Sequence, residues 1–283
     1  MKKTYALFAV LLIAAAALIV FTMQSPESPE LPDLSMMGKV TVIAREEGSG
    51  TKDAYRQLVG TYEEGANKIA ISTNQAIEFT AEDKNAIAYV AYSTVAEAKN
   101  VKILSVNNVP ATYNHISSSK YPLVRPYLLA YKGELSDLEV DFLTYIHGAG
   151  QRLVAEHITP NRKPTSFLSN QAEGSLTING SSSVAPLMEA LVKEYCTYNK
   201  NAKIEVQVTD STGGINTALR GDCDLAMSSR ALKSYEAELL TVSVIGTDGV
   251  AVIVNAENPV TGLSLQQIKA IYDGKVPSWS DLK

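Results

Sequence analysis

Residues 44–58, AREEGSGTKDAYRQL, place an arginine and a glycine-rich, hydroxyl-rich turn directly before a helical pattern. The start of a helix carries unpaired backbone N–H groups and a partial positive charge. The two glycines of GSGT let the backbone approach a ligand closely, and its serine and threonine add hydroxyl donors. Arg45 offers a planar guanidinium that fits a tetrahedral oxyanion. An oxyanion site is one interpretation. The other is an ordinary helix start capped by Ser49, with Asp53 complementing the dipole.

Three further junctions between a strand and a helix carry the same residue types. They are TINGSSSVAPL at 177–187, QVTDSTGGINTAL at 207–219 and LAMSSRAL at 225–232. A cap needs one hydroxyl, whereas the four junctions together hold more hydroxyls than caps require, and two arginines as well. A shared oxyanion site explains this surplus better than four separate caps.

Composition limits the class of protein. The chain has 283 residues, 46% of them hydrophobic and 19% charged, which is long enough for two lobes. A net charge of −5 argues against a nucleic-acid-binding protein. An anion site must therefore be local, built from a few donors in a cleft. His115, His147 and His157 show no metal-ligand spacing, and we expect neither a metal nor a cofactor.

The first residues predict export and a membrane anchor. MKK precedes an uncharged, mostly apolar run at residues 5–23, which is long enough to span a bilayer as a helix. The lysines favour a cytoplasmic N-terminus, so the remainder would lie outside the cytoplasm. We expect an uncleaved anchor because the run ends in VFTMQS, a poor cleavage context; a cleaved signal peptide is the alternative. The Pro-, Ser- and Glu-rich segment that follows predicts an extended tether, so that residues 1–37 form anchor and tether.

From residue 38 the pattern is α/β. The expected strands are 39–44, 85–92, 101–106, 121–131, 175–180, 203–210, 223–229 and 249–255. The expected helices are 50–62, 136–158, 185–199, 213–221 and 264–274. Residues 159–174, which are rich in helix breakers and lack periodicity, predict a linker. Strands that alternate with helices imply mostly parallel sheets with ligand sites at the carboxyl ends of the strands.

Several segments together resemble one family. TINGSSSVAPLMEALVKEY, DSTGGINTALRGDCDLAMSSR, DGVAVIVNAENPVTGLSLQQIKAIYDGKVPSWSDL and VIAREEGSGTKDAY are similar to phosphate-binding proteins, the substrate-binding components of phosphate ABC importers. NAIAYV and SSSKYPLVRPYLLAYKGE resemble the later part of that family. The resemblance implies a two-lobed, type II periplasmic-binding-protein fold. It also implies inorganic phosphate as the ligand, an ABC permease as the partner, and no enzymatic activity.

The order of these segments differs from the family's order. In the family the GSSSV segment comes first and REEGSGT follows WSDL, whereas here the chain begins just before REEGSGT and ends at SWSDLK. The resemblance therefore implies a circular permutation, or a tandem duplication trimmed at both ends. Lobe A would combine residues 38–120 with 255–283, and lobe B would hold 121–254, including the linker at 159–174. Because each family segment is present once, we expect a monomer; a domain-swapped dimer is the alternative.

The resemblance also implies a set of ligand residues. The phosphate-binding residues would be Arg45, Ser49, Gly50, Thr51, Ser181, Ser182, Ser183, Ser211 and Ser229. Well-known members carry an aspartate at the position of Ser229, where it accepts the proton of monohydrogen phosphate and so excludes sulfate. Residues that could accept this proton or support the site are Glu47, Asp248, Arg230 and Thr212. Arg230 is either a second clamp on the anion or a partner of one of the carboxylates.

Two rival functions are weaker. SSSK at 117–120 has the S-x-x-K spacing of penicillin-binding proteins, but no S-D-N or K-T-G accompanies it. A membrane-tethered sensor or scaffold that has lost its ligand has no physical reason to keep four polar strand ends. Cys196 and Cys223 are predicted to lie at the end of a lobe opposite the ligand. There they either form a disulfide or stay as two small buried side chains.

Overall fold

The computed structural model describes residues 29–95 and 98–283. The membrane segment expected at residues 5–23 lies outside these ranges. Within them, no helix combines the length and apolar character needed to cross a membrane.

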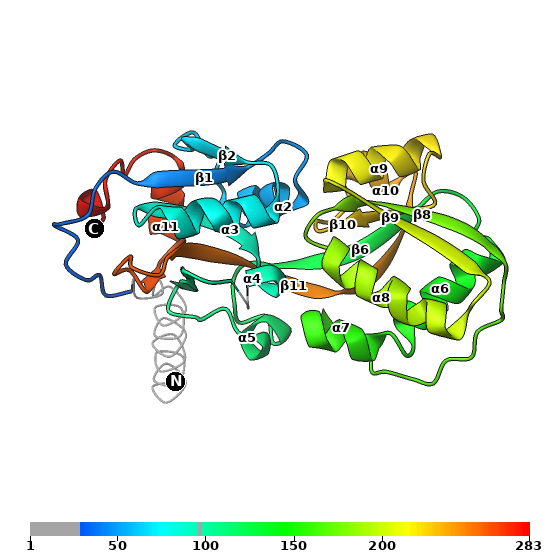
Figure 1. The fold of residues 1–283 in the computed structure, drawn as a ribbon. Coiled ribbons are helices and arrows are strands. Elements are labelled where there is room, and N and C mark those ends of the chain that lie inside the picture. Colours follow the sequence, from blue (N-terminus) through cyan, green and yellow to red (C-terminus); the bar gives the residue numbers. More distant parts are fainter. Residues whose placement is uncertain (1–28, 96–97) are drawn as a thin grey trace, which may run out of the picture.

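The chain folds into two α/β lobes that lie side by side (Figure 1). Lobe A begins with β1 (Thr41–Arg45), α2 (Gly50–Val59), β2 (Lys68–Ala70), α3 (Thr73–Glu82) and β3 (Ala86–Ala91). Short elements follow: α4 (Tyr92–Val95), β4 (Val101–Ile103), β5 (Ser105–Val106) and α5 (Tyr113–Ser117). The end of the chain completes this lobe with β12 (Gly262–Leu263), α11 (Leu265–Tyr272) and a 3₁₀ turn at Trp279–Asp281.

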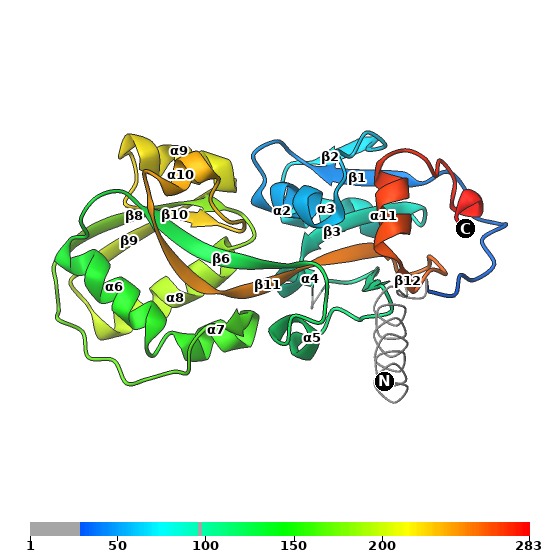
Figure 2. The ribbon, with the colours of Figure 1, turned by 180° about the vertical axis from the view of Figure 1, so that it is seen from behind.

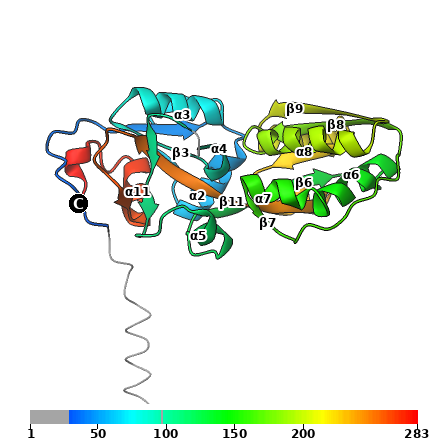
Figure 3. The same ribbon diagram turned by 60° about the horizontal axis from the view of Figure 1, so that its bottom comes forward.

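Lobe B repeats the opening pattern of lobe A. Its elements are β8 (Gly174–Ser181), α8 (Ala185–Tyr198), β9 (Ala202–Thr209), α9 (Ser211–Arg220), β10 (Leu225–Ser228) and α10 (Ser234–Ala237). Before them in the chain come α6 (Asp137–His147), α7 (Gln151–His157) and β7 (Thr159–Pro160). Figure 3 shows α6, α7 and α8 along one side of the lobe. Each lobe is therefore built on the same β-α-β-α-β unit.

Two long strands join the lobes. β6 (Val124–Tyr131) and β11 (Thr241–Asn255) run antiparallel from one lobe to the other, as Figure 2 shows from behind. They make the sheet continuous, with strand order β2-β1-β3-β11-β6-β10-β8-β9. Within each lobe the three strands of the repeated unit are parallel, so the helix starts that follow them lie at a common edge.

The hydrophobic core is divided in the same way as the lobes. The main core of lobe A packs side chains from β1, α2 and β3 with Tyr272 and Trp279 from the chain end. The main core of lobe B packs α6, α7 and α8 against its sheet. Both cores draw on β6 and β11, because Val124 and Val250 pack in lobe A while Leu129 and Ile245 pack in lobe B. These two strands are the covalent and hydrogen-bonded connection between the lobes, and they are called the hinge below.

The structure corrects three of the expected elements. The single strand expected at 101–106 is two short strands, because β4 pairs with β11 whereas β5 pairs with β12. The single helix expected at 136–158 is two helices, α6 and α7, because the chain breaks at Gly148–Gly150. A Cβ on Gly150 would lie 3.0 Å from the carbonyl oxygen of Tyr145, so the glycine permits the tight packing of the break. The strand expected at 249–255 begins eight residues earlier, at Thr241, where β11 pairs with β6.

The two ends of the folded chain lie against one another. The amide of Val40 donates to the carbonyl of Pro277 at 3.0 Å, and the amide of Trp279 donates to the carbonyl of Gly38 at 3.1 Å. Residues 38–40 and 277–279 therefore form one connected piece of backbone structure, although they are separated by almost the whole chain.

The segment between α7 and β8 is fixed to lobe B. The ring of Phe167 packs at 5.5 Å from that of Tyr145. The hydroxyl of Ser169 and the amide of Asn170 donate to the buried carboxylate of Asp141 at 2.7 and 2.9 Å. The expected linker is thus irregular but held by side chains.

The two cysteines are free thiols in the structure. Cys196 on α8 packs at the edge of the main core of lobe B, whereas Cys223 is buried in a second cluster formed with α9. Burial, aided by the nearby Asp224, raises the pKa of Cys223 to about 11. Of the two expected outcomes, the structure has the unbridged one.

We therefore expect a thiol reagent to label two cysteines in the native, unreduced protein. Cys196 should react first, because Cys223 is only 8% exposed and the thiolate is the reactive species. Mass spectrometry of the time course checks the order. Recovery of unlabelled protein until a reductant is added would contradict it.

Candidate functional site

The helix starts of the two lobes face one another across the cleft. Thr51 on α2 lies 3.0 Å from Ser183 of lobe B, hydroxyl to hydroxyl. The amide of Thr212 donates to the carbonyl of Gly48 at 3.1 Å. A Cβ on Gly50 would come within 2.7 Å of the Cβ of Ser211, so only glycine allows this approach. The four sequence junctions therefore meet in one place.

Most of these hydroxyls are not needed as caps. Ser49 does cap α2, accepting the amide of Lys52 at 3.4 Å. Helix α9 is capped by Asp210, and the hydroxyls after it are spare. No side chain caps α8, which leaves Ser181, Ser182 and Ser183 available. The structure therefore also has more hydroxyl groups at these helix starts than the caps use.

Arg45 is buried at the carboxyl end of β1 and reaches into lobe B. Its side chain is 2% exposed. Its Nη2 donates to the hydroxyl of Ser182 at 3.3 Å, and its Nη1 donates to that of Thr73 at 3.0 Å. Glu46 accepts a bidentate pair of bonds from the same guanidinium, both at 2.8 Å. This fork geometry holds the arginine rigidly at the cleft.

A compact hydroxyl cluster forms the lobe B wall. Ser181 donates to Ser229 at 3.0 Å, and the hydroxyls of Ser211 and Ser229 lie 3.4 Å apart. The amide of Ser229 also donates to the hydroxyl of Ser211 at 3.1 Å. All three serines are at most 3% exposed. The lobe B wall of the site is therefore lined by neutral donors, which need no counterion.

Neither of the two candidate carboxylates bonds to this cluster. The side chain of Glu47 is 77% exposed and pairs with Lys52, whose hydrogen bond lowers the pKa of Glu47. Asp248 is buried, and burial raises its pKa despite the neighbouring Arg125. Its carboxylate accepts the amide of Ser93 at 3.1 Å.

Arg230 is a partner of carboxylates, but of two that the sequence analysis had not paired with it. It donates to Glu236 at 2.7 and 2.9 Å and lies 3.0 Å from Asp53 of lobe A. Burial alone would lower the pKa of Arg230, but Glu236 and Asp53 raise it overall. Thr212 accepts a bond from the same guanidinium at 3.3 Å. Arg230 and Thr212 thus belong to an ionic contact between the lobes.

Two residues at the site were missed by sequence reasoning. Thr73 is the first residue of α3, a helix capped by Ser72, so its hydroxyl is spare in the same sense as the others. Arg125 lies inside β6 and donates to Thr51 at 2.7 Å and to the carbonyl of Ser229 at 3.1 Å. Thr73 marks a fifth strand-to-helix junction, which the sequence does signal. Arg125 follows no junction pattern.

Two pockets lie between the lobes. One of about 290 Å³ is lined by Ser72, Thr73, Asn74, Thr94, Ser182, Ala185, Pro186, Glu189 and Val208. The other, of about 490 Å³, is lined by Asp53, Arg56, Gln57, Arg230, Ala231, Leu232, Lys233 and Ser234. Both are lined by residues of both lobes, so opening the cleft would join them to the buried hydroxyls.

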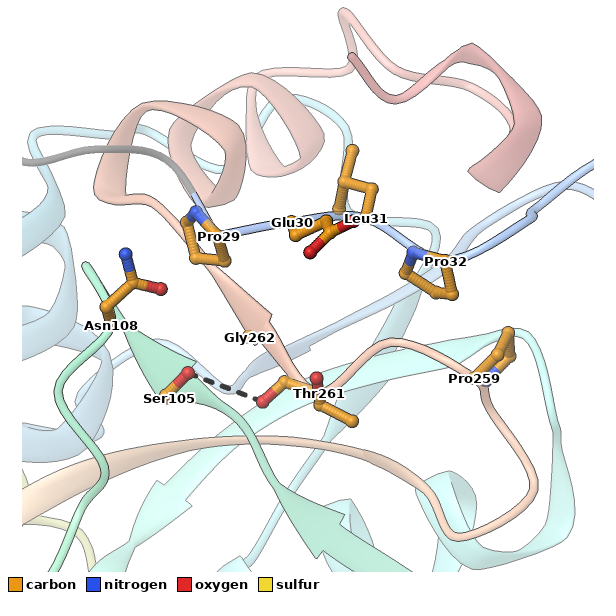
Figure 4. Close-up of a pocket in the computed structure, with 9 residues that line it drawn as sticks. All are labelled: Pro29, Glu30, Leu31, Pro32, Ser105, Asn108, Pro259, Thr261 and Gly262. Atoms are coloured by element: carbon orange, nitrogen blue, oxygen red, sulfur yellow. Dashed lines mark hydrogen bonds between the residues drawn. The ribbon is translucent and has the colours of Figure 1, made fainter.

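A separate hollow lies on lobe A, away from the strand ends (Figure 4). Residues 29–32 form one wall, and the strand pair β5–β12 lies beneath, where Ser105 donates to the carbonyl of Thr261 at 3.4 Å. None of the hydroxyl residues of the cleft lines it. In the described part of the chain, no three His, Cys, Asp or Glu side chains gather as metal ligands.

Comparison with known proteins agrees with the fold. The sequence model of the PBP superfamily domain matches residues 32–149 and 165–283. Phosphate-binding protein PstS 2 of Streptococcus agalactiae serotype V is 34% identical over 265 residues, covering 88% of this chain and 89% of the relative. Phosphate-binding protein PstS 2 of Streptococcus pneumoniae serotype 4 is 31% identical over 262 residues, with the same coverage.

A solved structure extends the likeness to three dimensions. It is the crystal structure of a phosphate-binding protein of a phosphate ABC transporter from Streptococcus pneumoniae TIGR4. It superposes with a TM-score of 0.70 at 30% identity, covering 87% of this chain and 100% of the other. The chain therefore belongs to the PBP superfamily and, within it, to the family of phosphate-binding proteins.

Proposed function

We propose that this protein binds inorganic phosphate outside the cytoplasm and passes it to an ABC permease, with no catalytic step of its own. The observation that carries the proposal is the convergence of a buried arginine and a surplus of hydroxyl donors from both lobes. The proposed ligands are Arg45, Ser49, Gly50, Thr51, Ser181, Ser182, Ser183, Ser211 and Ser229. Helix-start amides and hydroxyls suit an oxyanion because they donate without adding charge.

The names of the relatives support phosphate as the ligand. Two curated relatives that cover most of this chain are phosphate-binding proteins, and the similar solved structure is that of a phosphate transporter component. Binding between two lobes also suits a carrier, because closure removes the anion from water and opening releases it.

Isothermal titration of purified protein, dialysed free of phosphate, tests the proposal. We expect one site per chain with a dissociation constant in the micromolar range or tighter. Heat on titration with sulfate alone would instead support a binder of another oxyanion. Absence of heat with either anion would support a membrane-tethered sensor or scaffold.

Preference for phosphate over sulfate is the finer part of this proposal. The hydroxyls of Ser181, Ser211 and Ser229 bond to one another, and no carboxylate of the described residues bonds to them. A hydroxyl can accept as well as donate, so one of these serines could take the proton of monohydrogen phosphate. Competition between the two anions in the same titration measures the preference.

We further propose that residues 5–23 anchor the protein to the outer face of the cell membrane without cleavage. The length and charge of that segment support an anchor, and a cleaved signal peptide is the alternative. N-terminal sequencing of the protein isolated from cells separates the two. A start beyond residue 23 would replace the anchor by a secreted form.

We also propose that the chain is a circular permutation. The expected lobe bounds, 38–120 with 255–283 for lobe A and 121–254 for lobe B, need an adjustment, because Leu34, Leu123 and Val250 pack in the core of lobe A. One observation supports the permutation. The backbone at Gly38 hydrogen-bonds to that at Trp279, so the ends meet where an unpermuted chain would be continuous. The two Streptococcus relatives align with this chain over 88% of its length and 89% of their own, so the permutation is proposed relative to family members with the other segment order.

Each lobe can be filled by one chain, so we expect a monomer. Light scattering on dilution checks this, because a domain-swapped dimer would also gain stability with concentration. A dimer that persists at nanomolar concentration would overturn the one-chain arrangement.

A further inference from the structure

Arg125 is the basic residue of β6 in the hinge, and it touches both lobes. Its side chain is 1% exposed within β6. One Nη atom donates to the hydroxyl of Thr51 in lobe A at 2.7 Å and to the carbonyl of Ser229 in lobe B at 3.1 Å. The other lies 3.4 Å from Asp248. A hinge residue is thus bonded directly to the two walls of the cleft.

The bond from Arg125 fixes which way the Thr51 hydroxyl points. A guanidinium can only donate, so Thr51 must accept this bond with a lone pair. Its single proton is then directed elsewhere, and its other close hydroxyl is Ser183 at 3.0 Å. Thr51 is therefore held as a donor.

The same logic runs from the other arginine. Arg45 donates to Thr73 at 3.0 Å, and the Thr73 hydroxyl lies 3.2 Å from that of Ser183. Thr73 must accept from Arg45, which leaves its proton for Ser183. Two arginine-to-threonine chains, one from each guanidinium, therefore converge on a single serine.

We propose that Arg125 is a positioning residue of the anion site, which acts through Thr51 to make Ser183 an obligate donor. Ser183 receives two protons, which occupy both of its lone pairs, so its own proton is left to donate outward. An anion that enters the cleft can accept this outward proton of Ser183. The inference rests on the proposed function, because an oxyanion is the ligand that needs hydroxyls held in this sense.

Attraction by charge is not the role of Arg125. The carboxylate of Asp248 lies beside its guanidinium, and both side chains are at most 1% exposed, so the pair adds little net charge to the cleft. The role left for Arg125 is to orient a hydroxyl, because its bond to Thr51 sets the direction of that hydroxyl before the ligand arrives. Such pre-orientation reduces the ordering that binding would otherwise require.

A double-mutant cycle tests this role. Arg125→Gln combined with Asp248→Asn removes both buried charges together, and Thr51→Val removes the hydroxyl. We expect either change to weaken phosphate binding by about 10- to 100-fold, the range for a hydrogen bond to a charged group. Both changes act through the hydroxyl of Thr51. The protein that carries all three substitutions should therefore bind phosphate no more than about 2-fold more weakly than Thr51→Val alone. If the fold-losses in phosphate affinity from the two changes multiply, the proposal is overturned. Unchanged phosphate binding in the protein with Arg125→Gln and Asp248→Asn (the Gln/Asn protein) would overturn it as well.

A matched control separates positioning from general damage. Thr80→Val removes a buried hydroxyl of lobe A that bonds only within α3, to the carbonyl of Ala76. In this background the Gln/Asn change should keep its full effect on phosphate affinity. A loss of that effect would mean that any change in lobe A masks it.

The same cycle can be read without a ligand. Thermal unfolding of the four proteins should show coupling between the Arg125 and Thr51 changes, since their bond exists in the structure without an anion. If the unaltered protein gives no heat with phosphate, the proposed function fails. The unfolding measurement still shows whether Arg125 and Thr51 are coupled. Additive unfolding effects would then overturn the positioning role by themselves.

Discussion

Replacing Arg45 by alanine is expected to weaken phosphate binding by about 30-fold or more. Removing one partner of a buried, hydrogen-bonded charge pair costs about 2–5 kcal/mol. Arg45 is 2% exposed, and it holds Thr73 in lobe A and Ser182 in lobe B, so its loss also frees two donors. Glu46 would remain beside the cleft without its partner and would repel the anion. Titration calorimetry measures the change.

The matched control for this variant is Arg220→Ala. Arg220 lies on lobe B, is 61% exposed, and pairs with Asp222 at the surface. Its loss should leave the dissociation constant unchanged, because a surface ion pair contributes little. If Arg45→Ala and Arg220→Ala bind phosphate equally well, the anion does not lie at the end of β1.

Gly50→Ala is expected to abolish tight binding while leaving the fold intact. The added Cβ would lie 2.7 Å from the Cβ of Ser211 and 2.8 Å from the hydroxyl of Ser229, both in lobe B. Carbon atoms do not pack that closely, so the lobes could not reach the closed arrangement. Gly50 is the first residue of α2, where alanine is well tolerated, so the melting temperature should change little. The expected loss of affinity is about 100-fold or more, equal to about 2.7 kcal/mol.

Gly38→Ala is the control for this steric effect. A Cβ there would meet the side chain of Asn85 at 3.4 Å, an ordinary contact within lobe A. Small-angle scattering with and without phosphate completes the test, since Gly50→Ala should stay open in both conditions. A Gly50→Ala protein that closes and binds normally would show that the lobes do not meet at this glycine in the bound state.

The parts of the site that follow local patterns could be predicted from the sequence. Arg45 and Ser181–Ser183 stand at junctions whose hydroxyl surplus is visible in the letters alone. Thr73 belongs to the same pattern but was missed, because the strand before it, β2, has only three residues and shows no periodicity.

Arg125 could not be found in this way. It sits in the interior of a strand beside Pro126, and its partners Thr51 and Asp248 are 74 and 123 residues away. The break between α6 and α7 and the early start of β11 were missed for a related reason. Each depends on packing or strand pairing across the fold, as with Gly150 against Leu191 of α8 and β11 against β6.

The positions in the sequence of the residues that form the two cores have a consequence for folding during synthesis. Every buried residue of the main lobe B core lies between Ala91 and Ile245, whereas that of lobe A needs residues from both Leu34–Leu123 and Val250–Leu282. Domains fold as units while the chain is synthesised from its N-terminus. The lobe that is translated first must therefore wait for the last residues, and lobe B is the one that we expect to mature first. Strand β3 stays without its partner β11 for most of synthesis, which makes the first half of lobe A the part that most needs protection from aggregation.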